Sequence, residues 1–151
     1  TFDRVFDPDC SQGEVYEYAA KPIIRGVMQG FNGTVFAYGQ TASGKTYTME
    51  GPDLYSEQDM GVIPRMVDTL FEEAETAPED IEYTIRISLV EIYNERIRDL
   101  MDLSKDHLKI KEDPRKGVFI AGVTERYINN KELIFEILKE GHANRSHPPC
   151  S

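Results

Sequence analysis

One eight-residue segment, Gly39-Gln-Thr-Ala-Ser-Gly-Lys-Thr46, constrains this chain more than any other part of it. The segment matches the pattern G-x-x-x-x-G-K-[ST] at every fixed position. Its glycines let the backbone curl so that successive N–H groups point into one concave nest. A helix that starts near residues 44–46 would add its own unpaired N–H groups and the positive end of its dipole. The segment therefore predicts a phosphate-binding P-loop (residues 39–46).

The sequence on either side supports this prediction. Residues 34–38 form a short, nearly continuous apolar run, typical of a strand buried on both faces, and a P-loop follows a strand and opens a helix. Lys45 would meet the β- and γ-phosphates, and the Thr46 hydroxyl is an oxygen ligand suited to Mg²⁺. The residues predicted to hold the phosphates of ATP or GTP are Gly39, Gln40, Thr41, Ala42, Ser43, Gly44, Lys45 and Thr46. The alternative, a glycine turn without a ligand, is disfavoured by this context.

A P-loop that supports hydrolysis also needs an acidic residue that holds Mg²⁺ through water, usually an Asp after an apolar strand. Glu91, at the end of Ser88-Leu-Val-Glu91, is the candidate. The alternative, that Glu91 caps or pairs at the end of a strand, is favoured. No other apolar strand ends in a convincing Asp, so the sequence shows no complete hydrolytic site and no catalytic residue.

Length, composition and charge indicate which broad classes of protein this chain can belong to. The 151 residues suffice for one domain with a core, and a hydrophobic content of 40% is that of a globular chain. With a net charge of −10, the chain lacks the overall basic field that is typical of a nucleic-acid binder. The same charge disfavours binding to an acidic membrane surface. No apolar run approaches the roughly 20 residues of a membrane span. We therefore expect a cytoplasmic protein that binds neither nucleic acid nor membrane.

The histidines and cysteines predict neither a metal site nor a disulfide. His107, His142 and His147 are isolated, and no two of them have the i, i+4 spacing of a metal site. Cys10 and Cys150 lie at opposite ends of the chain, so both are expected to be free thiols.

The first predicted helix begins at Ser11, which has the capping-box spacing to Glu14. Pro22 is expected to kink this helix, and Gly30 is expected to end it. Its predicted apolar face comprises Val15, Ala19, Ile23 and Val27.

Periodicity predicts the remaining elements. Strands are expected at residues 1–6, 81–89, 108–110 and 118–120, the last two joined by a turn at 113–117, and a short helix is expected at 94–100. Residues 51–61 are expected to form an exposed loop. A middle helix would bury Ile63, Val67, Leu70 and Phe71. The last helix would be capped by Asn129, stopped by Gly141, and bury Leu133, Ile134, Ile137 and Leu138.

Several segments, taken in order, resemble the kinesin motor domain. The most specific is Phe31-Asn-Gly-Thr-Val-Phe-Ala-Tyr-Gly-Gln-Thr-Ala-Ser-Gly-Lys-Thr-Tyr-Thr-Met49, which is similar to the P-loop of that family and the strand before it. The others are Phe2-Asp-Arg-Val-Phe6, Gly61-Val-Ile-Pro-Arg65, Ser88-Leu-Val-Glu-Ile-Tyr-Asn-Glu95 with Arg98-Asp-Leu100, and Gly141 with Asn144-Arg145. The resemblance covers nearly the whole chain. It implies a partial motor domain over residues 1–145, followed by an irregular tail at 146–151.

The resemblance implies an α/β fold of the P-loop NTPase type, with a central, mainly parallel sheet flanked by helices, here incomplete. It implies ATP and Mg²⁺ as ligands, with Thr46 at the metal and Tyr47 near the base. The parent protein would hydrolyse ATP to move along microtubules (tubulin), would belong to the cytoskeleton, and is compatible with a homodimer. Arg115 and Lys116 lie where the family has a minor microtubule contact, although an ordinary solvated turn is at least as good an interpretation. The 51–61 loop resembles a variable insertion that lines an inhibitor pocket in some members.

Other motifs of that family are missing. The chain has no Asp-Leu-Ala-Gly motif, which carries the acid on the Mg²⁺ side, and no intact Asn-x-x-Ser-Ser-Arg-Ser-His switch, although Arg145-Ser-His147 matches its last three residues. The resemblance also assigns Glu91 to the structural core. Two hypotheses stay open: the ATP-binding part of a motor protein, or a truncated, non-enzymatic remnant that binds nucleotide at most. In either case we expect this chain alone to hydrolyse ATP negligibly and to bind microtubules weakly.

Overall fold

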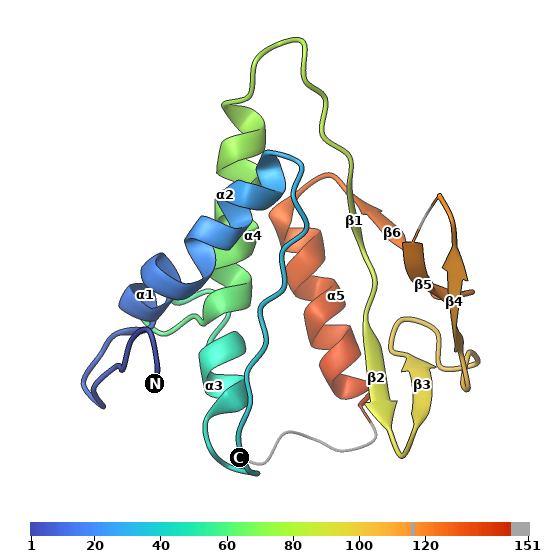
Figure 1. Cartoon of the computed structure of the whole chain (residues 1–151), viewed down its shortest axis with the longest axis horizontal. Helices are drawn as coiled ribbons and strands as arrows, with labels where there is room; N and C mark the ends of the chain where they lie inside the picture. The colour runs from blue at the N-terminus through green and yellow to red at the C-terminus, as the bar shows by residue number, and fades with distance from the viewer. Residues whose placement is uncertain (116, 146–151) are drawn as a thin grey trace. The chain divides into compact units, whose positions relative to one another are not determined.

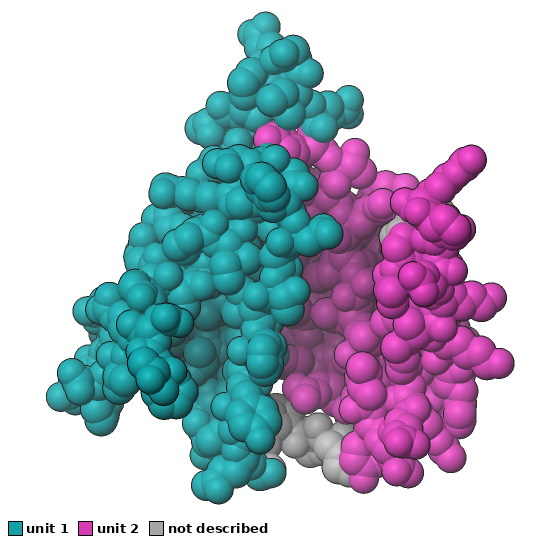
Figure 2. Space-filling view, viewed as in Figure 1, with its two compact units in different colours: residues 1–82, 149–151 teal, residues 83–148 magenta. Residues whose placement is uncertain are grey.

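The computed structural model describes residues 1–115 and 117–145 (Figure 1). Expectations that concern Lys116 or residues 146–151, including His147, Cys150 and the tail, lie outside this part. The described residues form two compact units, residues 1–82 and residues 83–145, which Figure 2 draws in different colours. The first unit holds the P-loop and most of the helices, and the second holds the strands.

The first unit opens with three consecutive helical segments, α1 (Gln12–Val15), the π-helical segment η1 (Tyr16–Ala20) and α2 (Lys21–Met28). The predicted capping box is confirmed. The backbone N–H of Glu14 donates to Ser11 Oγ at 3.2 Å, and the backbone N–H of Ser11 donates to Glu14 Oε2 at 2.9 Å. These two bonds satisfy backbone donors that the first turn of a helix leaves free.

The helix is interrupted next to Pro22, where the sequence predicts a kink, and the interruption takes the form of η1. Pro22 stands at the start of α2, where its missing N–H costs no helical hydrogen bond. Gly30 ends the helix as predicted, with a φ of 93° that favours glycine. The predicted apolar face is wrong by one position, because α4 packs against η1 and α2 on a different side. The side chains buried there are Gln12, Tyr16, Ala20 and Ile24.

The core of the first unit lies between η1 and α4 (Val62–Glu75). Tyr16, Ala20 and Val62 form its buried cluster, with Val35, Met49 and Met66 packed against it. The Tyr16 hydroxyl lies 2.6 Å from Thr69 Oγ1, so the polar end of this buried ring has a partner. Of the predicted apolar face of α4, Val67 is buried, and Ile63, Leu70 and Phe71 are half-buried. The other buried residues of α4 are Val62, Pro64 and Thr69.

The 51–61 loop is irregular and mostly exposed, as predicted, and its two ends are held together. The N–H of Gly61 donates to Glu50 O at 2.9 Å. A Cβ on Gly51 would lie 2.2 Å from Asp59 O, and a Cβ on Gly61 would lie 2.6 Å from Glu50 N. Two glycines therefore permit the backbones at the start and the end of the loop to touch.

Two predicted strands are absent from the first unit: residues 1–6 and residues 34–38 have no strand hydrogen bonds. A strand needs a neighbour to pair with, and no described strand pairs with either segment. Phe36 and Tyr38 are 79% and 93% exposed, so the predicted burial of residues 34–38 is also wrong. In the first segment, the Arg4 guanidinium lies over the rings of Phe6 and Tyr18 at 4.9 and 4.6 Å.

The second unit contains three antiparallel strand pairs (Figure 1). They join β1 (Ile85–Ile87) to β6 (Arg126–Ile128), β2 (Val90–Tyr93) to β3 (Arg96–Asp99), and β4 (Lys109–Asp113) to β5 (Gly117–Ala121). The predicted strands at 108–110 and 118–120 are confirmed as the β4–β5 hairpin. The mainly parallel central sheet is not among the pairings of the described residues.

Two elements of the second unit differ from prediction. The strand expected from residue 81 begins only at Ile85, because that is where its partner β6, which the sequence did not predict, starts to pair. The helix predicted for residues 94–100 is wrong, since β3 occupies this region. Asn94 and Glu95 have φ values of 49° and 61°, the left-handed pair that closes a two-residue hairpin between β2 and β3.

Helix α5 (Lys131–Ala143) buries its predicted apolar face at Ile134, Ile137 and Leu138, and also buries Phe135. Its cap is Asn130 rather than the predicted Asn129, because the Asn130 side chain accepts from Leu133 N at 2.8 Å. The predicted stop at Gly141 is also wrong. A Cβ on this glycine would lie 2.7 Å from Leu89 Cδ1, so the glycine allows close packing inside the helix. None of the described helices is both long and apolar enough to cross a membrane.

We expect Gly61→Ala to destabilise the fold, because the new Cβ would lie 2.6–2.7 Å from the backbone of residues 48–50. Overpacking of this kind costs about 1–3 kcal/mol. Gly26→Ala in α2 is the matched control, since its Cβ would meet nothing within 4 Å and alanine favours the helix by about 1 kcal/mol. Urea denaturation of both variants should show opposite shifts of the midpoint. Equal stability of Gly61→Ala and the unchanged chain would contradict the close contact.

The capping box predicts a pH dependence of stability. Hydrogen bonds from the Ser11 backbone N–H and hydroxyl hold the pKa of Glu14 below its usual range. A lowered pKa gives stability that is complete above the unfolded value of about 4.3 and is lost as pH falls through the folded value. The stability difference between the unchanged chain and Glu14→Gln should therefore close below about pH 4. Denaturation curves from pH 7 downward test this, with Glu136→Gln on α5 as the control for net charge.

Candidate phosphate-binding site

The P-loop leads directly into the short helix α3 (Lys45–Met49), so the predicted loop–helix junction is confirmed. Gly44 precedes the helix with a φ of 90°, and Ala42 has a φ of 63°. The N–H of Ser43 donates to Gln40 O at 3.2 Å and closes a turn inside the loop. A Cβ on Gly39 would lie 2.3 Å from Ser43 Oγ, so glycine allows the loop to fold this tightly.

The Lys45 ammonium folds back onto the beginning of the loop. Its Nζ donates to Gly39 O at 2.9 Å and to Gln40 O at 2.7 Å. Both acceptors are main-chain carbonyls, so no carboxylate neutralises the lysine in these contacts. The positive charge therefore stays beside the loop, where it is available to an anion.

The inner surface of the loop is accessible and rich in donors. Residues 40–44 are exposed, whereas Lys45 and Thr46 are half-buried. In the part of the chain that the structure describes, the backbone amides of Gly44, Lys45 and Thr46 have no intramolecular hydrogen-bond partner. Unpaired amides and an ammonium are groups that bind phosphate oxygens. Tyr47, at 55% exposure, stands next to them on the accessible surface of α3.

Glu91 lies in the second unit, on β2, where its Oε1 is 3.9 Å from Arg145 Nε. Its side chain is only 11% exposed. This ion pair agrees with the favoured interpretation that Glu91 pairs with another residue, but Glu91 lies within β2 rather than at the end of a strand. No group of three or more His, Cys, Asp or Glu side chains within residues 1–115 and 117–145 is arranged to hold a metal ion.

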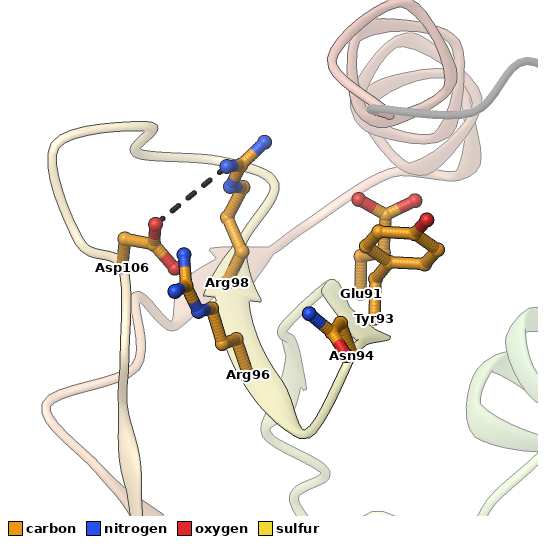
Figure 3. A pocket seen from close by; sticks show the side chains of 6 residues that line it. All are labelled: Glu91, Tyr93, Asn94, Arg96, Arg98 and Asp106. Carbon is orange, nitrogen blue, oxygen red and sulfur yellow. Dashed lines mark ion pairs between the residues drawn. The ribbon is translucent and has the colours of Figure 1, made fainter.

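Glu91 also lines a hollow of about 210 Å³ in the second unit (Figure 3). The other side chains of its wall are Tyr93, Asn94, Arg96, Arg98 and Asp106. Arg98 Nη2 lies 3.6 Å from Asp106 Oδ2, the ion pair drawn as a dashed line in Figure 3. The pKa of Asp106 is lowered, chiefly by the hydrogen bond that its carboxylate accepts from the His107 backbone N–H. Two arginines and two carboxylates thus share this wall.

The family described as the kinesin motor domain matches residues 1–151. Kinesin-related protein 3 of Dictyostelium discoideum is 47% identical over 148 residues, which are 97% of this chain and 12% of that protein. The kinesin heavy chain of Strongylocentrotus purpuratus is 46% identical over 144 residues, 95% of this chain and 14% of that protein. The human kinesin heavy chain isoform 5C is 45% identical and covered to 15% of its length.

A solved structure of a fast kinesin, described for its ATPase mechanism and its interactions with microtubules, superposes on this chain with a TM-score of 0.92. The two are 42% identical in sequence, and the match covers 95% of this chain and 41% of that one. The described fold is therefore that of part of a kinesin motor domain. The chain spans less than half of the solved structure and less than a fifth of each of these three relatives.

Proposed function

Because the chain belongs to the kinesin motor-domain family, we propose that its P-loop binds the phosphates of Mg-ATP. The observation that carries this proposal is the position of Lys45, whose ammonium is held at the mouth of the loop by two main-chain carbonyls. The amides of residues 44–46 belong to the same segment and have no hydrogen-bond partner among the described residues. A phosphate bound at the loop would contact this ammonium and these amide donors.

Each predicted site residue has a part in this proposal. Gly39 and Gly44 permit the tight turn of the loop, and residues 40–43 present main-chain groups to the phosphates. Lys45 exchanges its carbonyl partners for the β- and γ-phosphate oxygens. Thr46 offers its hydroxyl as a ligand to Mg²⁺, which would neutralise charge on the phosphates. Tyr47 packs near the nucleotide base.

We propose further that, in a longer protein containing this chain, ATP hydrolysis drives movement along microtubules. The support is similarity: the matching curated proteins are named kinesins, and the fast kinesin is described for its ATPase and its microtubule interactions. A cytoskeletal location, a tubulin partner and a homodimeric parent belong to this proposal. The microtubule contact in this proposal includes Arg115, which is exposed in the turn between β4 and β5.

We expect Lys45→Ala to weaken Mg-ATP binding about 10- to 100-fold, because a hydrogen bond to a charged group contributes about 1.5–3 kcal/mol. Titration calorimetry on the 151-residue chain measures this directly. Lys139→Ala, at an exposed position of α5, is the control for the loss of one positive charge. The same binding heat in Lys45→Ala and in the unchanged chain would show that the nucleotide binds elsewhere.

We expect the 151-residue chain alone to release phosphate from ATP no faster than the Lys45→Ala variant, with or without microtubules. A P-loop needs a group that positions water and a sensor of the γ-phosphate, and neither switch motif is intact in this sequence. The net charge of −10 also opposes binding to the acidic surface of tubulin. A phosphate-release assay combined with microtubule cosedimentation tests both points. Lys45-dependent turnover stimulated by microtubules would contradict this expectation and favour an active fragment.

A further inference from the structure

Gln12, in the first turn of α1, is a polar residue in a buried place. Only 6% of its surface is exposed, although it lies next to the exposed capping residue Ser11. A buried amide is costly unless it is hydrogen-bonded. Its partners therefore show what this side chain contributes to the unit.

The Gln12 amide group contacts two main-chain carbonyls from different parts of the unit. Its Nε2 donates to Tyr47 O at 2.6 Å and lies 3.5 Å from Asp59 O. A carbonyl can only accept, so the NH₂ end of the amide is the end that fits between them. One side chain from α1 thus reaches both α3 and the end of the 51–61 loop.

The carbonyl of Tyr47 needs this donor because α3 is too short to supply one. In a longer α-helix the N–H of Gly51 would reach Tyr47 O, but here it donates to Thr46 O at 3.3 Å. The last carbonyls of a helix must find partners outside it. Gln12 provides that partner for Tyr47.

The second carbonyl, Asp59 O, lies at the junction where the 51–61 loop closes. This oxygen would touch a Cβ on Gly51, and the N–H of Gly61 donates to Glu50 O at 2.9 Å. Gln12 therefore bonds to α3 and contacts the end of the 51–61 loop with the same amide group. Lys45 and Thr46 are the last two residues of the P-loop, and Tyr47 follows them directly. A shift of the Tyr47 carbonyl would therefore displace both of them.

We propose that Gln12 is a positioning residue for the nucleotide site: its amide fixes α3 against α1 and the 51–61 loop, and so sets where Lys45 and Thr46 stand. The role in binding rests on the proposed Mg-ATP site, whereas the role in holding α3 does not. Gln12 itself touches no nucleotide in this proposal.

The first measurement is amide hydrogen exchange in Gln12→Met, which keeps the length of the side chain and removes both donors. Exchange at Thr48, Glu50 and Gly51 should become about tenfold faster, as expected for the loss of one net hydrogen bond, while the amides of α2 keep their rates. Gln29→Met, at the exposed end of α2, is the matched control. Unchanged exchange at residues 48–51 would overturn the proposal, whether or not the chain binds ATP.

The second measurement is Mg-ATP titration of the same variants. Gln12→Met should bind about tenfold more weakly, and Gln29→Met should bind like the unchanged chain. Faster exchange at residues 48–51 with unchanged ATP affinity would reduce Gln12 to a stabilising residue and overturn its positioning role. Absence of Lys45-dependent binding in the unchanged chain would defeat the proposed function instead, and hydrogen exchange would still decide whether Gln12 holds α3.

If Gln12→Met does not fold, a milder variant tests the same proposal. Gln12→Asn keeps the amide but shortens the side chain by one methylene, so it cannot reach Tyr47 O without a shift of α1. It should show the same two effects, with smaller size, against Gln29→Asn as the control. A folded Gln12→Asn with unchanged exchange and affinity would contradict the proposal.

Discussion

Helix α3 has only five residues, and a helix of that length does not hold its shape in water by itself. Lys45 and Thr46, to which the proposed site gives the most specific roles, are its first two residues. Their positions therefore depend on contacts that other segments make with α3. Met49 packs against the core of the first unit, the N–H of Gly61 bonds to Glu50 O, and Gln12 bonds to Tyr47 O. These three contacts hold α3, and with it the last two residues of the P-loop, in place.

In the second unit, a buried carboxylate holds together segments that are distant in sequence. Asp99, at the end of β3, has no exposed surface. Its Oδ1 accepts from the backbone N–H groups of Met101 and Asp102, and its Oδ2 accepts from Thr124 N at 2.6 Å. A buried charge is tolerated only when such donors surround it. One side chain thus joins the turn after β3 to the segment before β6, which are far apart in sequence.

The sequence predicted those features that depend on neighbours along the chain. The capping box of Ser11 and Glu14, the end of the first helix at Gly30, the β4–β5 hairpin and the P-loop before α3 all rest on interactions across a few residues. Some failed predictions were also local, namely the cap at Asn130 and the β2–β3 hairpin, but two others depend on distant partners. Residues 34–38 have a strand composition, but no strand among the described residues pairs with them; Gly141 continues a helix because Leu89 requires the space.

In the candidate site too, some features follow from the sequence and others only from the tertiary structure. Residues 39–46 could be read from the sequence alone, because a loop that curls around phosphate demands glycine, lysine and a hydroxyl at fixed spacing. The sequence likewise determined the family, through segments that keep their order over nearly the whole chain. Only the tertiary structure decided that Gln12 lies against Tyr47 and Asp59, 35 and 47 residues away in sequence. A buried amide has no periodicity or motif of its own, since its role is defined by carbonyls that only the folded chain brings to it.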